Sequence, residues 1–104
     1  MRLRATFRYR GADWRAYIAS EKELKKLWSP WATTDENMGG FIDAEAKSIF
    51  VLSGSSRTLE RQRMFHELLH MANFEANLGL THAQVYGLDK ELHRLLRLLW
   101  ETTN

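Results

Sequence analysis

The start of the chain alternates between apolar and polar residues with the period of a β-strand. The apolar positions of the run from Arg2 to Arg10 are Leu3, Ala5, Phe7 and Tyr9. Arginines fill most of the positions between them, and because successive strand side chains point to opposite faces, the run predicts a half-buried strand. Turn residues around Gly11 and a second apolar run at Trp14–Ile18 predict its hairpin partner.

The next segment carries signals for a helix and then for a loop. Ser20 and Glu23 have the spacing of a capping box, which predicts a short helix that ends at Ser29-Pro30. Residues 31–40 are mostly polar and include two adjacent glycines, so we expect a loop there.

Two short apolar runs, at 41–42 and 49–52, predict a second hairpin. From about Thr58 the apolar spacing becomes helical, and Gly79 is the expected stop of this helix. The residues expected on its inner face are Leu59, Phe65, Leu68, Leu69 and Ala72.

A second capping box, Thr81 with Gln84, predicts a last helix that runs to about Trp100. The residues expected on its inner face are Val85, Leu88, Leu92, Leu95, Leu96 and Leu99. The whole pattern predicts one α+β domain over residues 1–104. A small antiparallel sheet with a short helix comes first, and two long helices follow.

Composition narrows the possible chemistry. The chain has no cysteine, so any metal ion must be held by His, Asp and Glu, and disulfides are excluded. No apolar run approaches the roughly 20 residues of a membrane span, and no secretory signal follows Met1. We therefore expect a cytoplasmic protein that does not enter a membrane.

The net charge of +2 hides a basic first third, with eight Lys and Arg against three Asp and Glu in residues 1–28. Such a surplus can attract nucleic acid or another acidic partner. However, no Gly-rich phosphate loop accompanies it, and no aromatic residues share the arginine face. A solvated sheet face explains the arginines, and we do not expect nucleic-acid binding.

The chemistry-bearing motif is His66-Glu67-Leu68-Leu69-His70, an H-E-x-x-H sequence within the first long helix. Residues four apart on a helix share a face, so both imidazoles can bind one zinc ion. Glu67 follows the first histidine and can accept a proton from a zinc-bound water. The alternative is that these side chains only decorate the helix beside its apolar face.

The second half of the chain resembles the minimal zincin-type metallopeptidases of the ImmA/IrrE-like kind, which phages often carry. The segments that carry the resemblance are the strand 49–52, Glu60-Arg61-Gln62-Arg63, the run 65–70, the turn 78–81 and the leucine-rich helix from Gln84. The resemblance implies a zinc hydrolase with His66 and His70 as ligands and Glu67 as the base.

A third zinc ligand must come from outside the motif. Asp89 is favoured, because it lies about 60° from the centre of the apolar stripe that is expected to face the first long helix. Glu91 lies about 100° away on the other flank, and it remains an alternative, as do a histidine and a water molecule.

Three more side chains of the last helix are candidates for a supporting role. His82, His93 and Tyr86 can orient a ligand or donate a hydrogen bond to an oxyanion. The alternative is that the histidines simply flank the apolar stripe, where His93 could pair with Asp89.

Two functions follow from these residues. The first is a zinc-dependent peptidase whose 40–52 hairpin offers a strand edge to an extended peptide substrate. The second is a catalytically silent protein of the same fold, which binds or regulates a partner and keeps a structural or vestigial zinc site.

Overall fold

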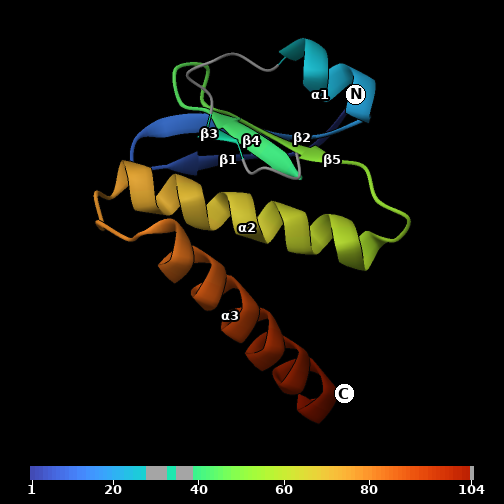
Figure 1. The fold of residues 1–104 in the computed structure, drawn as a ribbon, viewed down its shortest axis with the longest axis vertical. Coiled ribbons are helices and arrows are strands. Elements are labelled where there is room, and N and C mark those ends of the chain that lie inside the picture. The colour runs from blue at the N-terminus through green and yellow to red at the C-terminus, as the bar shows by residue number, and fades with distance from the viewer. Residues whose placement is uncertain (28–32, 35–38, 104) are drawn as a thin grey trace.

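The computed structural model describes residues 1–27, 33–34 and 39–103. Its strands are β1 (Arg2–Tyr9), β2 (Ala12–Ala19), β3 (Thr33–Thr34), β4 (Gly40–Asp43) and β5 (Ser48–Leu52). Its helices are α1 (Glu21–Leu27), α2 (Arg57–Glu75) and α3 (His82–Thr103). Helix α1 lies on one face of the sheet, α2 lies on the other, and α3 follows beyond α2 (Figure 1). The α+β class predicted from the sequence is confirmed.

The first hairpin is closed by the tight turn that its sequence favours. Arg10 and Gly11 both have positive φ angles, of 49° and 81°, between the paired residues Tyr9 and Ala12. Positive φ at both central residues matches the twist of the flanking strands. Turn chemistry therefore sets the register that directs Phe7 toward the core.

The sheet has the strand order β1-β2-β5-β4-β3. The sequence predicted an antiparallel sheet, and this prediction is wrong for one pair of strands. Strands β2 and β5 pair in parallel, because the chain passes through α1, β3 and β4 before it returns beside β2. The β4–β5 hairpin is confirmed.

The segment predicted as a loop contains a strand. Within 31–40, Thr33 and Thr34 form β3 and pair with Ile42 and Phe41 of β4. The prediction of a strand edge open to peptides is therefore wrong at these two residues of β4. The predicted helix stop at Ser29-Pro30 lies outside the described residues.

Each face of the sheet carries its own core. On the α2 face the buried residues are Trp14, Ala16, Ile18, Ile42, Ile49, Val51 and Met71. On the α1 face they are Ala19, Leu24, Phe41 and Phe50. Strand β5 supplies both, since Ile49 and Val51 point to one side and Phe50 to the other.

Helix α2 begins where Ser56 accepts a hydrogen bond from the Leu59 amide, and it ends four residues before the predicted stop at Gly79. Asn77, at φ 52°, takes the left-handed position. Its amide bonds the Phe74 carbonyl, and the Leu78 amide bonds the Asn73 carbonyl, which is a Schellman ending. The helix can end earlier than predicted because Asn77 tolerates a positive φ angle, as glycine does.

Helix α3 begins as predicted, because Thr81 and Gln84 exchange side-chain-to-backbone hydrogen bonds. Its expected inner face is mostly outside, however. Val85 is fully buried, whereas Leu88, Leu95, Leu96 and Leu99 are 39–57% exposed. Figure 1 shows why: the second half of α3 projects away from the sheet and from α2. No helix in the described ranges is long and apolar enough to cross a membrane.

Candidate metal centre

The H-E-x-x-H motif lies on the buried side of α2. His66 and Glu67 are 6% and 2% exposed and, with Met71, they are the buried residues of this helix. The apolar residues that were expected on the inner face of this helix are only half-buried; they are Leu59, Phe65, Leu68, Leu69 and Ala72. The motif therefore does more than border the apolar face, because its first two residues are in contact with the body of the protein.

Glu67 fits against the sheet because β4 begins with a glycine. A Cβ atom at Gly40 would stand 3.1 Å from the Glu67 side chain and only 2.5 Å from the Phe50 carbonyl oxygen. A carbon atom cannot approach backbone oxygen so closely without a shift of the strand or the helix. Gly40 thus makes room for Glu67, a role that the sequence alone did not reveal.

The two motif histidines point to one place. His66 Nε2 and His70 Nε2 lie 3.1 Å apart. Two nitrogen ligands of a tetrahedral zinc ion, each about 2.05 Å from the metal, lie about 3.3 Å apart. The spacing of these two nitrogens therefore fits one edge of a zinc site.

Asp89 approaches the other nitrogen of His66. Its Oδ2 lies 3.3 Å from His66 Nδ1, across the interface between α2 and α3. A proton on Nδ1 donated to this carboxylate leaves Nε2 with a lone pair, which is the tautomer that a metal ion requires. This contact suits a residue that positions His66. Asp89 as the third zinc ligand remains a prediction.

His93 continues this arrangement. Its Nε2 lies 3.1 Å from Asp89 Oδ1, one turn back along α3, and this contact is an ion pair only when the imidazole is protonated. Both atoms are buried, and neither forms a hydrogen bond with the described residues. The His93 ring also packs edge-on against Phe65 of α2, with centroids 4.5 Å apart. The Asp89 carboxylate thus lies between two imidazoles.

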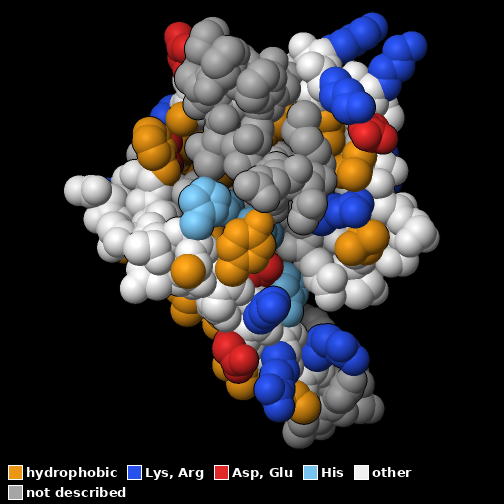
Figure 2. All heavy atoms as spheres, in the orientation of Figure 1, with side chains coloured by type: hydrophobic (Ala, Val, Ile, Leu, Met, Phe, Trp, Pro, Cys, Tyr) orange, Lys and Arg blue, Asp and Glu red, His pale blue; other side chains and the backbone are white. Residues whose placement is uncertain are grey.

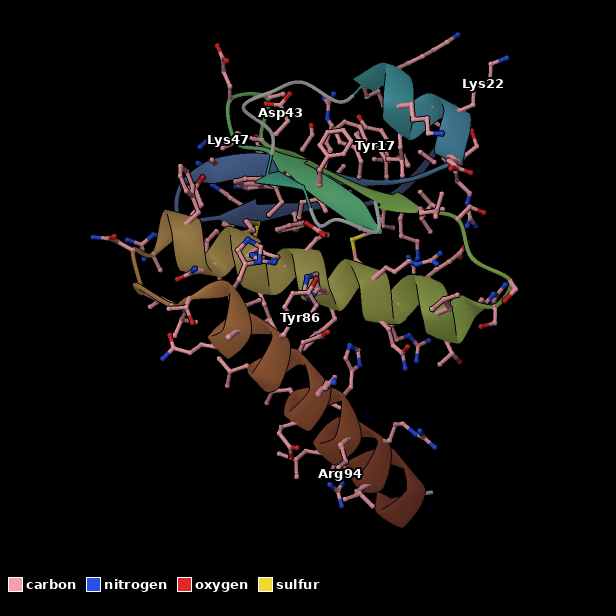
Figure 3. All side chains as sticks on the ribbon, in the orientation of Figure 1. Tyr17, Lys22, Asp43, Lys47, Tyr86 and Arg94 are labelled. Carbon is pink, nitrogen blue, oxygen red and sulfur yellow. The ribbon has the colours of Figure 1, made fainter. Side chains whose placement is uncertain are left out.

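His82 and Tyr86 cover the motif from the first turns of α3. The His82 ring lies 5.0 Å from the His70 ring, and the Tyr86 ring lies 4.7 Å from the His66 ring. Figure 3 shows Tyr86 on the part of α3 nearest α2. The two rings therefore flank the space toward which the motif histidines point.

These contacts correct the helical phase assumed from the sequence. The residues of α3 that face α2 are His82, Tyr86, Asp89 and His93. We call them the polar stripe; their spacing of four, three and four residues follows one side of a helix. The leucines lie roughly 100° around the helix from this stripe. Glu91, the alternative ligand, is exposed.

Among the described residues, no group of three His, Asp or Glu side chains has an arrangement that could hold a metal ion. The His66–His70 edge is in place, and Asp89 contacts the side of His66 away from it. The residues fit two positions of a zinc site and one supporting contact.

The turn between the helices is held by a side chain that the sequence did not single out. The Asn73 amide donates to the Leu80 carbonyl at 3.0 Å, and its oxygen accepts from the Leu80 amide at 2.9 Å. These two hydrogen bonds hold Leu80, which lies one residue before the Thr81 cap, and they therefore set where α3 begins. A lone asparagine late in a helix gives no spacing signal for this role.

A small cavity adjoins the site. It measures about 190 Å³, and its lining includes His66, Glu67, Tyr86, Asp89 and Gly39. A larger cavity of about 680 Å³, between β1 and α2, has none of the motif's charged or imidazole side chains in its lining. Figure 2 shows the histidine surfaces gathered where α3 meets the body of the protein.

Comparison of the chain with protein-family models, with curated proteins and with solved structures finds no match in any of the three. The resemblance to zincin-type metallopeptidases therefore stays a prediction that depends on the motif residues.

Proposed function

We propose that this protein is a zinc-dependent peptidase. The observation that carries the proposal is the pair of Nε2 atoms of His66 and His70, 3.1 Å apart, directly beside buried Glu67. Neutral imidazoles at this spacing suit zinc, and a carboxylate next to the first of them suits a general base.

Each residue has a distinct task in this proposal. A zinc ion bound there supplies an activated water and polarises the scissile carbonyl. Glu67 takes the proton of the attacking water at its carboxylate and passes it to the leaving amine. Asp89 holds the proton on His66 Nδ1, and the exposed Tyr86 hydroxyl can donate to the developing oxyanion.

His82 is our candidate for the third protein ligand. Imidazoles that share a tetrahedral zinc ion have ring centroids about 5 Å apart. The His66–His70 and His70–His82 centroid distances are 4.7 and 5.0 Å. His82 is also exposed, so its side chain can rotate toward the motif pair.

Zinc affinity distinguishes the roles of His82 and Asp89. We expect His82→Ala to weaken zinc binding on the order of 100-fold or more. Asp89→Asn should change it only a few-fold, because the amide oxygen still accepts from His66 Nδ1, whereas Asp89→Ala should weaken it roughly 10–100-fold. Glu91→Ala is the matched control on the same helix, and its affinity should equal that of the wild type.

Competition titration of the purified wild type and of the four variants against a zinc-binding dye measures these affinities. A loss as large for Asp89→Asn as for His82→Ala would assign Asp89 to the metal itself, as the sequence predicted. A wild type that binds no zinc would overturn the proposed function.

Activity is tested with a peptide library read by mass spectrometry. The wild type should cleave members of the library, and Glu67→Gln should bind zinc but lose roughly 10²–10⁴-fold in rate. His66→Ala should lose both zinc and cleavage.

The small cavity favours a second candidate function, that of a catalytically silent binding or regulatory protein. Its volume of about 190 Å³ lies below the roughly 300–1,000 Å³ of most ligand pockets. If the wild type binds zinc stoichiometrically and cleaves nothing in the library, this second function replaces the first.

A further inference from the structure

The cavity of about 680 Å³ between β1 and α2 combines an apolar wall with a group of arginines. Its volume lies within the roughly 300–1,000 Å³ of most ligand pockets. The apolar wall is formed by Ala5, Phe7, Ala16, Ile18, Met64 and Leu68. The arginines are Arg2 and Arg4 of β1 and Arg57 and Arg61 of α2. We call this space the arginine cavity.

The apolar and charged parts of the arginine cavity lie at different depths. Ala16 and Ile18 are buried, whereas Arg4, Arg57 and Arg61 are exposed. The cavity is therefore apolar where it is deepest and positively charged where it opens to water. A ligand pocket with an apolar lining and a few convergent charged groups has this construction.

A β-bulge brings the arginines of β1 to this side of the sheet. The pairing of β1 with β2 shifts by one residue at Arg4, so that Arg2 lies directly opposite Ile18. Residues directly opposite each other share a face, and Arg2 accordingly reaches Glu60 of α2 at 3.4 Å. The alternation read from the sequence places Arg2 on the other face and is wrong at this end of the strand. Bulges of this kind re-aim side chains beside functional sites.

The charge of the arginine cavity is not balanced from within. Among the described residues, Glu60 is its one acidic lining residue, and it already has two partners. Arg2 contacts its Oε1, and the Gly54 amide donates to its Oε2 at 3.1 Å. The other three arginines form no ion pair with the described part of the chain. A cleft lined by one sign of charge concentrates counter-ions of the other sign.

We propose that the arginine cavity binds an amphipathic anion of the fatty-acid class. Its acyl chain lies along the apolar wall, and its carboxylate lies among Arg4, Arg57 and Arg61. The planar guanidinium fork matches a carboxylate, and removal of the acyl chain from water supplies hydrophobic free energy.

Both parts of the ligand are needed. A neutral apolar molecule would leave the arginines without a counter-ion, and a small inorganic anion would leave the apolar wall in contact with water. None of the side chains proposed to act at the zinc ion lines this cavity, so the proposal does not rest on the peptidase function.

Calorimetric titration of the whole chain with monomeric dodecanoate tests the proposal. We expect about one dodecanoate per chain, and affinity should fall up to about 4-fold for each methylene removed in decanoate and octanoate. Dodecan-1-ol has the same chain without the charge and should bind at least ~10-fold more weakly. Acetate should show no measurable binding. An affinity for dodecan-1-ol or acetate equal to that for dodecanoate would overturn the proposal.

Variants test where the anion binds. Ala5→Phe fills the cavity from an exposed position and should weaken dodecanoate binding at least ~10-fold. Arg61→Gln should weaken it about 10-fold, because a charge-assisted hydrogen bond is lost. Arg15→Gln is the matched control: it removes an exposed arginine of β2 outside the cavity, and its affinity should equal that of the wild type. Circular dichroism checks that each variant is folded.

A wild type that does not bind dodecanoate would overturn the proposal, as would unchanged binding in Ala5→Phe or Arg61→Gln. Cosedimentation with phosphatidylglycerol vesicles distinguishes a free ligand from a membrane surface. We expect the wild type to bind monomeric dodecanoate and to remain in solution. Cosedimentation that Arg61→Gln abolishes, without binding of monomeric dodecanoate, would assign the arginines to an anionic membrane surface instead.

Discussion

Helices α2 and α3 depart in opposite ways from the usual rule that apolar side chains are buried and polar ones are exposed. Helix α2 places an imidazole and a carboxylate, His66 and Glu67, among the most buried positions of the protein, while α3 exposes most of its leucines. Helix α2 lies flat on the sheet, so every residue on that side is covered, whatever its polarity. Helix α3 meets α2 through its first half, and polar contacts determine which side it presents.

The comparison shows where the cost of burial is incurred. A buried carboxylate is expensive unless hydrogen bonds or a cation offset its lost hydration. Exposed leucines cost nothing in hydrogen bonding, but they retain an unused hydrophobic free energy. Glu67 on α2 and the exposed leucines of α3 thus depart from the usual distribution of polarity in opposite ways, and Glu67 belongs to the proposed metal centre.

Zinc should strengthen the attachment of α3 to α2, and this is the largest effect we expect. Zinc at about 100 times its dissociation constant should raise the free energy of unfolding by about 2.7 kcal/mol. Urea denaturation with and without zinc measures it, and a chelator should reverse it. His70→Ala should show no stabilisation, and an equal gain in that variant would place the bound metal elsewhere.

Gly40→Ala should disturb the seat of α2 on the sheet. The added Cβ would lie 2.5 Å from the Phe50 carbonyl oxygen, so strand or helix must move, at an expected cost of about 2 kcal/mol of unfolding free energy. Gly87→Ala on α3 is the control. A Cβ there meets nothing within 4 Å, and helix propensity should raise stability by about 0.5–1 kcal/mol. Equal destabilisation by both variants in urea would contradict this difference between the helices.

Asn73→Ala should loosen α3 while leaving α2 on the sheet. Both hydrogen bonds to Leu80 are lost, and we expect about 2 kcal/mol of destabilisation. Asn73→Asp keeps the acceptor for the Leu80 amide and should cost less. Hydrogen exchange should accelerate in the first turns of α3 more than in α2, and uniform acceleration would show that the two helices unfold together.

The smallest effect lies outside both helices and serves as a reference. The Met1 amino group and the amide and hydroxyl of Ser20 lower the pKa of Glu23 from 4.5 to about 2. Because the folded pKa is depressed, the stabilisation is fully present above about pH 4.5 and is lost as the pH falls toward 2. Glu23→Gln should therefore melt slightly below the wild type at pH 7, and the two should converge near pH 2. A melting difference that persists at pH 2 would contradict this assignment.

Local patterns were sufficient wherever the physics is local. The hairpins follow from the period of two and from turn residues such as Gly11, and the capping boxes at Ser20 and Thr81 form as their spacing predicts. The motif itself is also local, because residues four apart on any helix share a face, and this brings His66 and His70 together.

Only the tertiary structure decided which side of each helix is buried. Helical periodicity groups residues by face, but it does not say which face meets the rest of the protein. The apolar stripe of α3 was assumed to face α2, and the polar stripe does so instead, since Asp89 contacts His66 there and the rings of His82 and His93 pack against rings of α2. The parallel β2–β5 pair and the place that Gly40 leaves for Glu67 likewise depend on segments distant in the sequence. Contacts between segments distant in the sequence cannot be predicted from the spacing of residues along the chain, because they form only when the protein folds.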